Sequence, residues 1–369
     1  MKARIEAAEW PVGGRLPSTS IVCSQYNASA ITVRAAFKEL VSAGYVESRP
    51  RSGFFVRDWQ QENKRQGGDL IALLVESVRS PFFTECIAGV EEICRAAGYH
   101  MLVGDSHAAA DFEAEHLRTL SELVAGFIIM PVSVDGNYSA YLPLLEKKIP
   151  FVFIDRYVEK LVAPSVTTDN ELGGYLAASH LLDCGRRQIF TLGVRDSSSQ
   201  RERLSGYERA VRERGIIPDP SWTRRTHLQN EEAGYEMTRE LLAEKRPKQP
   251  FGIFAVNDSV ARGSYLALKE AKLEIPRDAA VVGFDDINAV FFDPPLTSMR
   301  QDMREMGRLS TQLLLDTLNG KQNLQSVRLA PELIIRNSTD SASNFCLTKH
   351  ITKGLRSAST SPTPAFVSA

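Results

Sequence analysis

Residues 16–56 have the sequence LPSTSIVCSQYNASAITVRAAFKELVSAGYVESRPRSGFFV, and the interpretation of the whole chain starts from this stretch. A helix is predicted after Ser29, a residue type that favours the N-cap position. Its apolar side chains recur at helical spacing and are expected to face a core. These side chains are Val33, Phe37, Leu40 and Val41. The opposite face of the same helix carries polar and basic side chains, namely Thr32, Arg34 and Lys38.

The segments on either side of this helix complete a winged helix-turn-helix. Residues 18–26 have room for a short helix, and only a tight turn separates it from the next one. Residues 45–48 and 54–56 are expected to form two short strands around a turn that contains Arg49 and Arg51. Because a helix fits the major groove of B-form DNA and basic side chains neutralise phosphates, this layout suits duplex DNA. The alternative is a small helical subdomain with solvated charges.

The order of motifs resembles the DNA-binding domain of the GntR family of regulators. The matching motifs are Leu16-Pro17-Ser18, Thr32-Val33-Arg34, Gly44-Tyr45-Val46-Glu47, Arg49 and Ser52-Gly53-Phe54-Phe55-Val56. The resemblance implies that the residues lying at the DNA are Ser29, Thr32, Arg34, Arg49 and Gly53. Lys38 and Arg51 complete the set of DNA-binding candidates. The chain departs from the family pattern at Ser20 and Ala30, where arginine is usual.

Size and composition narrow the class of protein. A chain of 369 residues is expected to contain more than one domain. The net charge is −1, which excludes a uniformly basic coat, yet residues 1–65 contain ten Lys and Arg against six Asp and Glu. Five cysteines form no CxxC motif, so neither a disulfide framework nor a zinc site is indicated. With no leader-like segment and no apolar run of membrane-spanning length, we expect a cytoplasmic protein without metal or cofactor.

Changes in amino-acid composition along the chain indicate the domain organisation. Residues 1–57 form the expected DNA-binding domain, and residues 58–69 are polar with a glycine pair, which is typical of a linker. Residues 70–338 are expected to form an effector-binding domain. Residues 339–369 are rich in Ser and Thr and are expected to be a disordered tail.

In the expected effector domain, short apolar runs alternate with amphipathic helical windows. This alternation predicts an α/β fold with parallel sheets covered by helices on both faces. The strand candidates are residues 70–75, 99–103, 126–130, 151–154, 188–192, 251–256 and 279–284. They are too many for one regular sheet, so two doubly wound lobes with a cleft between them are expected.

Ligands of such folds bind beyond the carboxyl ends of the strands. Polar and aromatic residues recur after the predicted strands: Ser80, Phe82, Phe83, Asp105, Asp155, Arg156, Arg203, Asn257 and Asp285. Polar groups of this kind hydrogen-bond neighbouring hydroxyls, and an aromatic ring covers the CH face of a sugar. Each residue alone has a structural explanation. An Asp after a strand is more often an N-cap, as for Asp258 and Asp286, and the phenylalanines suit a core.

This region resembles the effector-binding domain of the LacI/GalR regulators, which is similar to periplasmic sugar-binding proteins. The motifs are Ser80-Pro81-Phe82-Phe83, Ile154-Asp155-Arg156, Arg203-Leu204-Ser205-Gly206-Tyr207, Asn257-Asp258, Val281-Val282-Gly283-Phe284-Asp285-Asp286 and Pro294-Pro295-Leu296-Thr297 followed by Gln301. The resemblance implies effector contacts at Asp155, Arg203, Asn257 and Asp285. It also implies that Phe82, Arg156 and Gln301 lie close by. Ser80 replaces the Asn of some members, and the linker shows no hinge-helix pattern.

A GntR head on a LacI-type body is the arrangement of arabinose-type repressors. It implies a DNA-binding transcriptional regulator, a repressor, whose operator affinity is controlled by a sugar-like effector, with a pentose as the first choice. A symmetric homodimer is expected, because such heads read pseudo-palindromic operators.

Two other classes of protein are alternatives for this chain. An enzyme, such as a pyridoxal-dependent fusion, is disfavoured because the chain has no G-x-G-x-x-G after a strand, no P-loop and no G-x-S-x-G elbow. The alternative function is a transport-type sugar receptor with weak or no DNA binding, against which the basic head counts.

Overall fold

The computed structural model describes residues 1–42, 44–49, 52–57, 68–132, 138–245, 247–322 and 324–339. Most of the predicted linker and nearly all of the predicted tail lie outside these residues. The chain divides into two compact units. The first contains Met1–Val166 and Met303–Val327, and the second contains Thr167–Asp302 and the chain from Arg328 onward.

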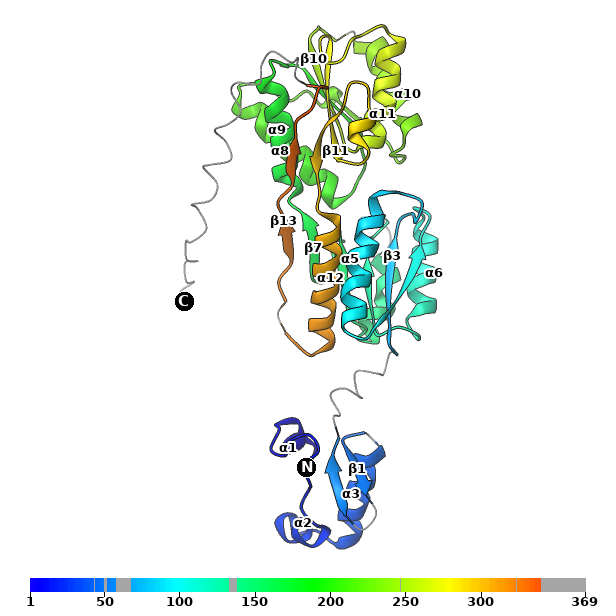
Figure 1. The fold of residues 1–369 in the computed structure, drawn as a ribbon, viewed down its shortest axis with the longest axis vertical. Helices are drawn as coiled ribbons and strands as arrows, with labels where there is room; N and C mark the ends of the chain where they lie inside the picture. The colour runs from blue at the N-terminus through cyan, green and yellow to red at the C-terminus, as the bar shows by residue number, and fades with distance from the viewer. Residues whose placement is uncertain are drawn as a thin grey trace. The chain divides into compact units, whose positions relative to one another are not determined.

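The N-terminal part of the first unit is three helices and a hairpin (Figure 1). Its elements are α1 (Lys2–Glu6), α2 (Thr19–Tyr26), α3 (Ala30–Ser42), β1 (Val46–Arg49) and β2 (Gly53–Val56). The two strands are antiparallel, in a register that pairs Val46 with Val56 and Arg49 with Gly53. The predicted winged helix-turn-helix fold is therefore confirmed for this segment, hereafter the head.

The core of the head is built on the predicted apolar face of α3. Val33 and Phe37 are almost fully buried, and Leu40 is buried too. The ring of Phe37 stacks on that of Phe54 in the hairpin, with centroids 4.2 Å apart, so helix and wing share one core. At the start of the helix, the Ser29 hydroxyl accepts a hydrogen bond from the Thr32 N–H (3.1 Å), as an N-cap does.

The remainder of the first unit is a sheet with helices on both faces. Its strands are β3 (Leu70–Val75), β4 (His100–Asp105), β5 (Gly126–Ile129), β6 (Phe151–Ile154), β7 (Ser165–Thr168) and β13 (Val327–Leu329), in the order β13-β7-β6-β5-β3-β4. Strands β3 to β7 pair in parallel. The helices are α5 (Phe82–Ala96), α6 (Ala110–Leu120), α7 (Tyr138–Glu146) and α12 (Met303–Leu318).

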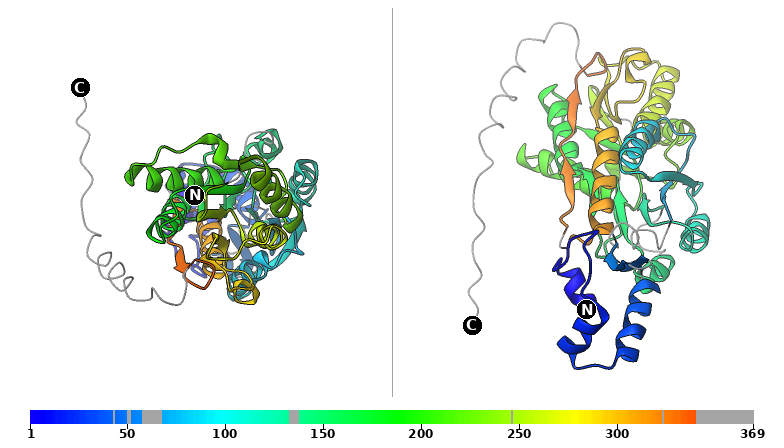
Figure 2. Two further views of the ribbon diagram at one scale, coloured as in Figure 1. Left: turned by 90° about the horizontal axis from the view of Figure 1, so that it is seen from above. Right: turned by 60° about the horizontal axis from the view of Figure 1, so that its bottom comes forward.

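The second unit repeats this plan. Its sheet has the order β14-β12-β11-β10-β8-β9, from β8 (Ile189–Val194), β9 (Thr223–Arg225), β10 (Phe251–Ala255), β11 (Ala279–Asp285), β12 (Thr297–Arg300) and β14 (Glu332–Ile334). Helices α8 (Asn170–Asp183) and α9 (Ser198–Glu213) cover one face, and α10 (Glu231–Lys245) and α11 (Asp258–Glu270) cover the other (Figures 1 and 2). The sheet is parallel except at β12–β14.

The two sheets share a topology that positions ligand sites. In each, the first strand in sequence lies inside the sheet, with β3 between β4 and β5 and β8 between β9 and β10. The chain therefore winds in opposite directions from the first strand, and ligands bind at the carboxyl end of such a switch point. The predicted apolar strands are confirmed. The sequence did not predict β7, β9, β12, β13 and β14, which are short and, for the most part, polar.

Three helix pairs are packed in backbone contact at glycines. The pairs are α5 with α12, α8 with α9, and α10 with α11. Each helix contributes one glycine, at which a Cβ would lie 1.9–2.4 Å from a carbonyl oxygen of its partner helix. These glycines are Gly89, Gly307, Gly174, Gly206, Gly234 and Gly263. No side chain larger than hydrogen fits at these positions without moving a helix.

We predict that Gly89→Ala destabilises the first unit. Its new methyl group would lie 2.1 Å from the Arg304 carbonyl oxygen, so α5 and α12 must separate. The expected cost in the free energy of unfolding is about 1–3 kcal/mol, measured by urea denaturation. The control is Thr84→Ala at an exposed position of the same helix, which should change stability by less than about 0.5 kcal/mol. Equal stability of both variants would contradict the close-packing explanation.

Candidate functional site

The outward face of α3 presents the predicted DNA-binding side chains. Thr32, Arg34 and Lys38 are all exposed. Within the described part of the chain, neither Arg34 nor Lys38 forms an ion pair, so both charges face solvent. Unpaired cations on a helix of groove-fitting size are suited to phosphates and base edges.

The hairpin of the head holds its cations differently. Nη2 of Arg49 is 2.5 Å from Oε1 of Glu47, and the guanidinium lies over the ring of Phe55, with Cζ 4.4 Å from the ring centroid. Gly53 has φ +101°, a conformation that favours glycine, and a Cβ there would lie 3.3 Å from Nε of Arg15. Arg15 was not among the candidates, although it directly precedes the Leu16 motif. The remaining candidate of the hairpin, Arg51, lies outside the described residues.

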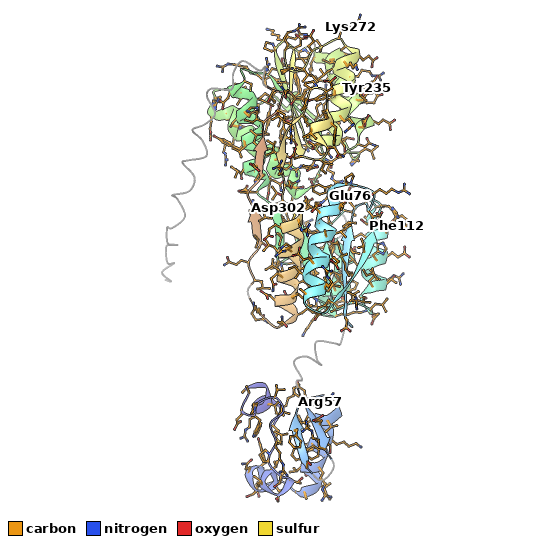
Figure 3. The ribbon with its side chains drawn as sticks, viewed as in Figure 1. Arg57, Glu76, Phe112, Tyr235, Lys272 and Asp302 are labelled. Carbon is orange, nitrogen blue, oxygen red and sulfur yellow. The ribbon has the colours of Figure 1, made fainter. Side chains whose placement is uncertain are left out.

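A buried charge network surrounds Arg156 in the first unit. Its Nη2 donates to Oε2 of Glu76 (2.6 Å), and its Nε is 3.4 Å from Oδ2 of Asp155. Glu76, which follows β3, is labelled in Figure 3. Burial opposes the charge of Arg156, but the carboxylates of Glu76, Asp155 and Glu113 raise its pKa on balance. Arg156 therefore holds the loops after β3 and β6 together and orients Asp155.

Glu113 and Tyr141 extend this network on the α6–α7 side. Glu113 is fully buried, and its two carboxylate oxygens accept hydrogen bonds from the Tyr141 hydroxyl (2.8 Å) and the Val132 N–H (2.7 Å). Burial and the neighbouring Glu113 raise the pKa of Tyr141. Sequence reasoning missed both residues, because each is part of an ordinary amphipathic helix pattern.

The candidates after β3 and β4 have separate structural roles. The Ser80 carbonyl accepts a hydrogen bond from the Phe83 N–H (3.1 Å) at the start of α5. Phe83 is buried, whereas Phe82 is partly exposed and meets it edge to face. The Asp105 carboxylate accepts the N–H of Val78 (3.1 Å) and of His107 (2.8 Å), which joins the loops after the two strands.

Arg203 is held rigidly in the second unit. It is 5% exposed, and its guanidinium lies 3.5 Å from the centroid of the Phe284 ring. Its Nε donates to Oδ1 of Asn170 (2.8 Å), and its Nη1 donates to the Val256 carbonyl (2.6 Å). The carbonyl belongs to the residue between β10 and Asn257, so this side chain of α9 joins the starts of α8 and α11.

Asp285 and Gln301 lie side by side at the ends of β11 and β12. Nε2 of Gln301 donates to Oδ1 of Asp285 (2.7 Å), and Oε1 of Gln301 accepts a hydrogen bond from the Thr168 hydroxyl. Gln301 and Thr168 are buried, while Asp285 is partly exposed. Asp285 has φ +103° and Asp155 has φ +66°, so both candidate carboxylates sit on left-handed backbone, a strain that often marks functional positions.

The residues at the start of α11 correct the N-cap interpretation. Asn257, not Asp258, caps the helix, since its side chain accepts the Val260 N–H (2.8 Å). Nδ2 of Asn257 donates to the Gln229 carbonyl (3.2 Å). The buried carboxyl of Asp258 instead accepts from the Ile287 N–H (2.6 Å) and the Ser298 hydroxyl (2.7 Å). Burial, followed by repulsion from Asp285, raises the pKa of Asp258 well above its ordinary value.

The other aspartate considered as an N-cap has a different role as well. Asp286 forms ion pairs with Arg300 (2.8 Å) and Arg336 (2.7 Å). Its side chain therefore ties the end of β11 to β12 and to the chain that follows β14, and no helix begins at this position.

The described residues contain no group of three or more His, Cys, Asp or Glu side chains placed to hold a metal ion. None of their helices has the length and apolar character that a membrane span requires.

The second unit brings together an arginine, an aspartate, amides and hydroxyls at the carboxyl end of one sheet. Such a set can hydrogen-bond a ligand rich in hydroxyl groups.

The similarity of the chain to known proteins covers both parts. The family of bacterial regulatory proteins called gntR matches residues 1–56, and the periplasmic binding protein-like domain matches residues 178–339. The arabinose metabolism transcriptional repressor of Halalkalibacterium halodurans is 30% identical over 345 residues, which cover 89% of this chain and 92% of the relative. The ribose operon repressor of Haemophilus influenzae is 32% identical, over 73% of this chain and 80% of the relative.

A solved structure extends the comparison to the fold. It is a LacI family transcriptional regulator from Enterococcus faecium with bound ribose, which is 29% identical with a TM-score of 0.63. The match covers 73% of this chain and 98% of that chain. The relatives named here are repressors and regulators rather than enzymes, as was expected for this chain. The chain therefore belongs to the family of bacterial transcriptional repressors that join a GntR-type winged helix-turn-helix to a LacI-type, periplasmic binding protein-like effector domain.

Proposed function

We propose that this repressor is controlled by a neutral sugar of the pentose class. The observation that carries the proposal is the pair of constellations in the second unit, Arg203 with Asn170 and Asp285 with Gln301. Both lie at carboxyl ends of strands and are held by hydrogen bonds of 2.7 and 2.8 Å. Rigid donors and acceptors of this kind lose little freedom when they bind neighbouring hydroxyls.

The first unit contributes the other candidates. Asp155 offers a carboxylate oriented by Arg156, and Phe82 offers a partly exposed ring for the CH face of a sugar. Ser80, Phe83 and Asp105 shape the loops that carry them. We propose each of these residues as an effector contact, as we do for Asn257 in the second unit.

The charges of the candidate residues favour a neutral ligand over a sugar phosphate. Arg156 already faces the carboxylates of Glu76 and Asp155. In the second unit, the Asp285 carboxylate directly follows Phe284, over whose ring the Arg203 guanidinium lies. Tight phosphate binding needs cations that are not already compensated, and the carboxylates beside Arg156 compensate its charge.

Three of the similar proteins support the pentose class. Two of them are named for ribose and for arabinose metabolism, and the solved regulator from Enterococcus faecium holds ribose. The division into a DNA-binding domain (1–57), a linker (58–69) and an effector domain (70–338) belongs to the same proposal. So do a symmetric homodimer on a pseudo-palindromic operator and a place of action in the cytoplasm.

The sugar acts as an inducer in this scheme. A ligand shifts the equilibrium between two states only by its difference in affinity for them. We infer a coupling free energy of about 1–3 kcal/mol, which corresponds to an operator affinity lowered by roughly 5- to 150-fold.

A ligand screen tests the proposal directly. Purified full-length protein is heated with D-ribose, L-arabinose, D-xylose, D-glucose, cellobiose or ribose 5-phosphate, and the Tm is measured. A ligand that binds only the native state raises the Tm, so at least one pentose is expected to do so and the phosphate is not. A shift with ribose 5-phosphate alone would contradict the charge argument. A sugar-binding protein that retains no DNA from a random duplex library would favour a transport-type receptor.

We predict that Arg34→Ala weakens operator binding without changing sugar affinity. The exposed guanidinium contacts a base edge or a phosphate, so its loss should cost about 1–3 kcal/mol or lower the slope of log K against log salt by about one. Binding to a selected operator is measured by fluorescence anisotropy at several salt concentrations. Arg118→Ala, which removes an exposed arginine of α6, is the control and should leave both affinities unchanged. Undiminished operator binding by Arg34→Ala would remove this residue from the interface.

We predict that Asp285→Ala abolishes the response to the sugar while operator binding persists. The variant loses a charged acceptor, and Nε2 of Gln301 loses its partner, so sugar affinity should fall by at least about tenfold. The readouts are the sugar-induced Tm shift and operator release. Asp183→Ala, at an exposed ion pair with Arg214, is the matched control. Release of operator by Asp285→Ala at the sugar concentration that suffices for wild type would contradict the assignment.

A further inference from the structure

The outward face of α3 has an apolar centre that none of the candidate contacts uses. Ile31 is 81% exposed, and Ala35 is exposed as well. Successive residues of a helix are about 100° apart, so Ile31 and Ala35 lie on one line along α3. That line is on the side opposite the buried residues Val33 and Leu40. Lys38 continues the same face one turn farther on.

An exposed isoleucine on an ordinary surface needs no explanation, because scattered apolar residues are common there. The position of Ile31 is different in that it lies two residues after the N-cap Ser29. The beginning of the second helix of a helix-turn-helix is the part that contacts base edges in the major groove. A wide apolar side chain at the centre of that surface becomes buried whenever the helix enters the groove.

The chemistry of the major groove restricts what such a side chain can recognise. Isoleucine has no donor or acceptor for base edges, and thymine alone presents a methyl group, at C5. We propose that Ile31 contacts a thymine C5-methyl group and makes the head select thymine at one operator position. This inference rests on the proposed DNA-binding function. The methyl group of Ala35 extends the apolar contact, while Arg34 and Lys38 supply charge at its border.

In vitro selection provides the first test. A randomised duplex library is selected with the full-length protein as wild type, Ile31→Ala and Ile21→Ala. Ile21 is a 49% exposed isoleucine of α2 and is the matched control for the loss of the same side chain. We expect wild type and Ile21→Ala to prefer thymine at a position where Ile31→Ala shows no preference. Identical preferences for wild type and Ile31→Ala would overturn the proposal.

Deoxyuridine provides the second test, because it removes the methyl group and nothing else. The selected operator is synthesised with deoxyuridine in place of that thymine, and its affinity is measured by anisotropy. Wild type is expected to bind it about fourfold more weakly, the effect of one buried methyl group. For Ile31→Ala, the change from thymine to deoxyuridine should weaken binding by less than about twofold. Ile31→Val, which keeps a branched side chain, should show an intermediate loss.

Other outcomes separate this inference from the proposed function. If Ile31→Ala weakens binding to the thymine and deoxyuridine duplexes by one common factor, Ile31 packs against protein or supports the fold, and the proposal fails while repressor function stands. If wild type selects no DNA at all, both fail. A thermal unfolding curve of Ile31→Ala verifies that the head is folded, which is expected because Ile31 is outside the core of the head.

Discussion

Backbone contact between helices is the constraint on which the candidate effector residues depend. A Cβ at Gly174 would lie 1.9 Å from the Arg203 carbonyl, and one at Gly206 would lie 1.9 Å from the Glu171 carbonyl. Helices α8 and α9 therefore approach as closely as their backbones allow. This approach places Asn170 at hydrogen-bonding distance from the Arg203 side chain. The close approach at these glycines therefore sets the position of the Arg203 guanidinium, although glycine has no side chain that could contact it.

The candidate residues Arg203 and Asp285 differ in how far they are exposed. Arg203 is buried over Phe284, and its hydrogen bonds to Asn170 and to the Val256 carbonyl join α8 and the end of β10 to α9. Asp285, in contrast, is partly exposed on strained backbone and is steadied by Gln301. A fixed arginine and a partly exposed carboxylate form a preorganised set, in which the fold has already provided the orientation that a ligand would otherwise have to induce.

Much of this fold was predictable because buried parallel strands are continuous apolar runs, as in β3 (LIALLV) and β6 (FVFI). The strands β7 (SVTT) and β12 (TSMR) were not predicted because their sequences are polar. Since Thr168 and Asn170 lie at and just after the end of β7, their roles were not predicted either. The pairing of Arg156 with Glu76 was also unpredictable, since 80 residues separate them and no local pattern relates them. The resemblance of motifs, rather than periodicity, indicated Gln301.

The head shows why a few side chains must carry its specificity. Arginine is absent at Ser20 and Ala30, and Arg49 is engaged with Glu47 and the Phe55 ring. Arg15, beside Gly53, adds a cation at the wing, and such a cation is suited to phosphates. Phosphate contacts set affinity and register without distinguishing sequences. In our proposal, base recognition falls to the α3 side chains around Arg34, and the apolar contact of Ile31 adds discrimination at one operator position.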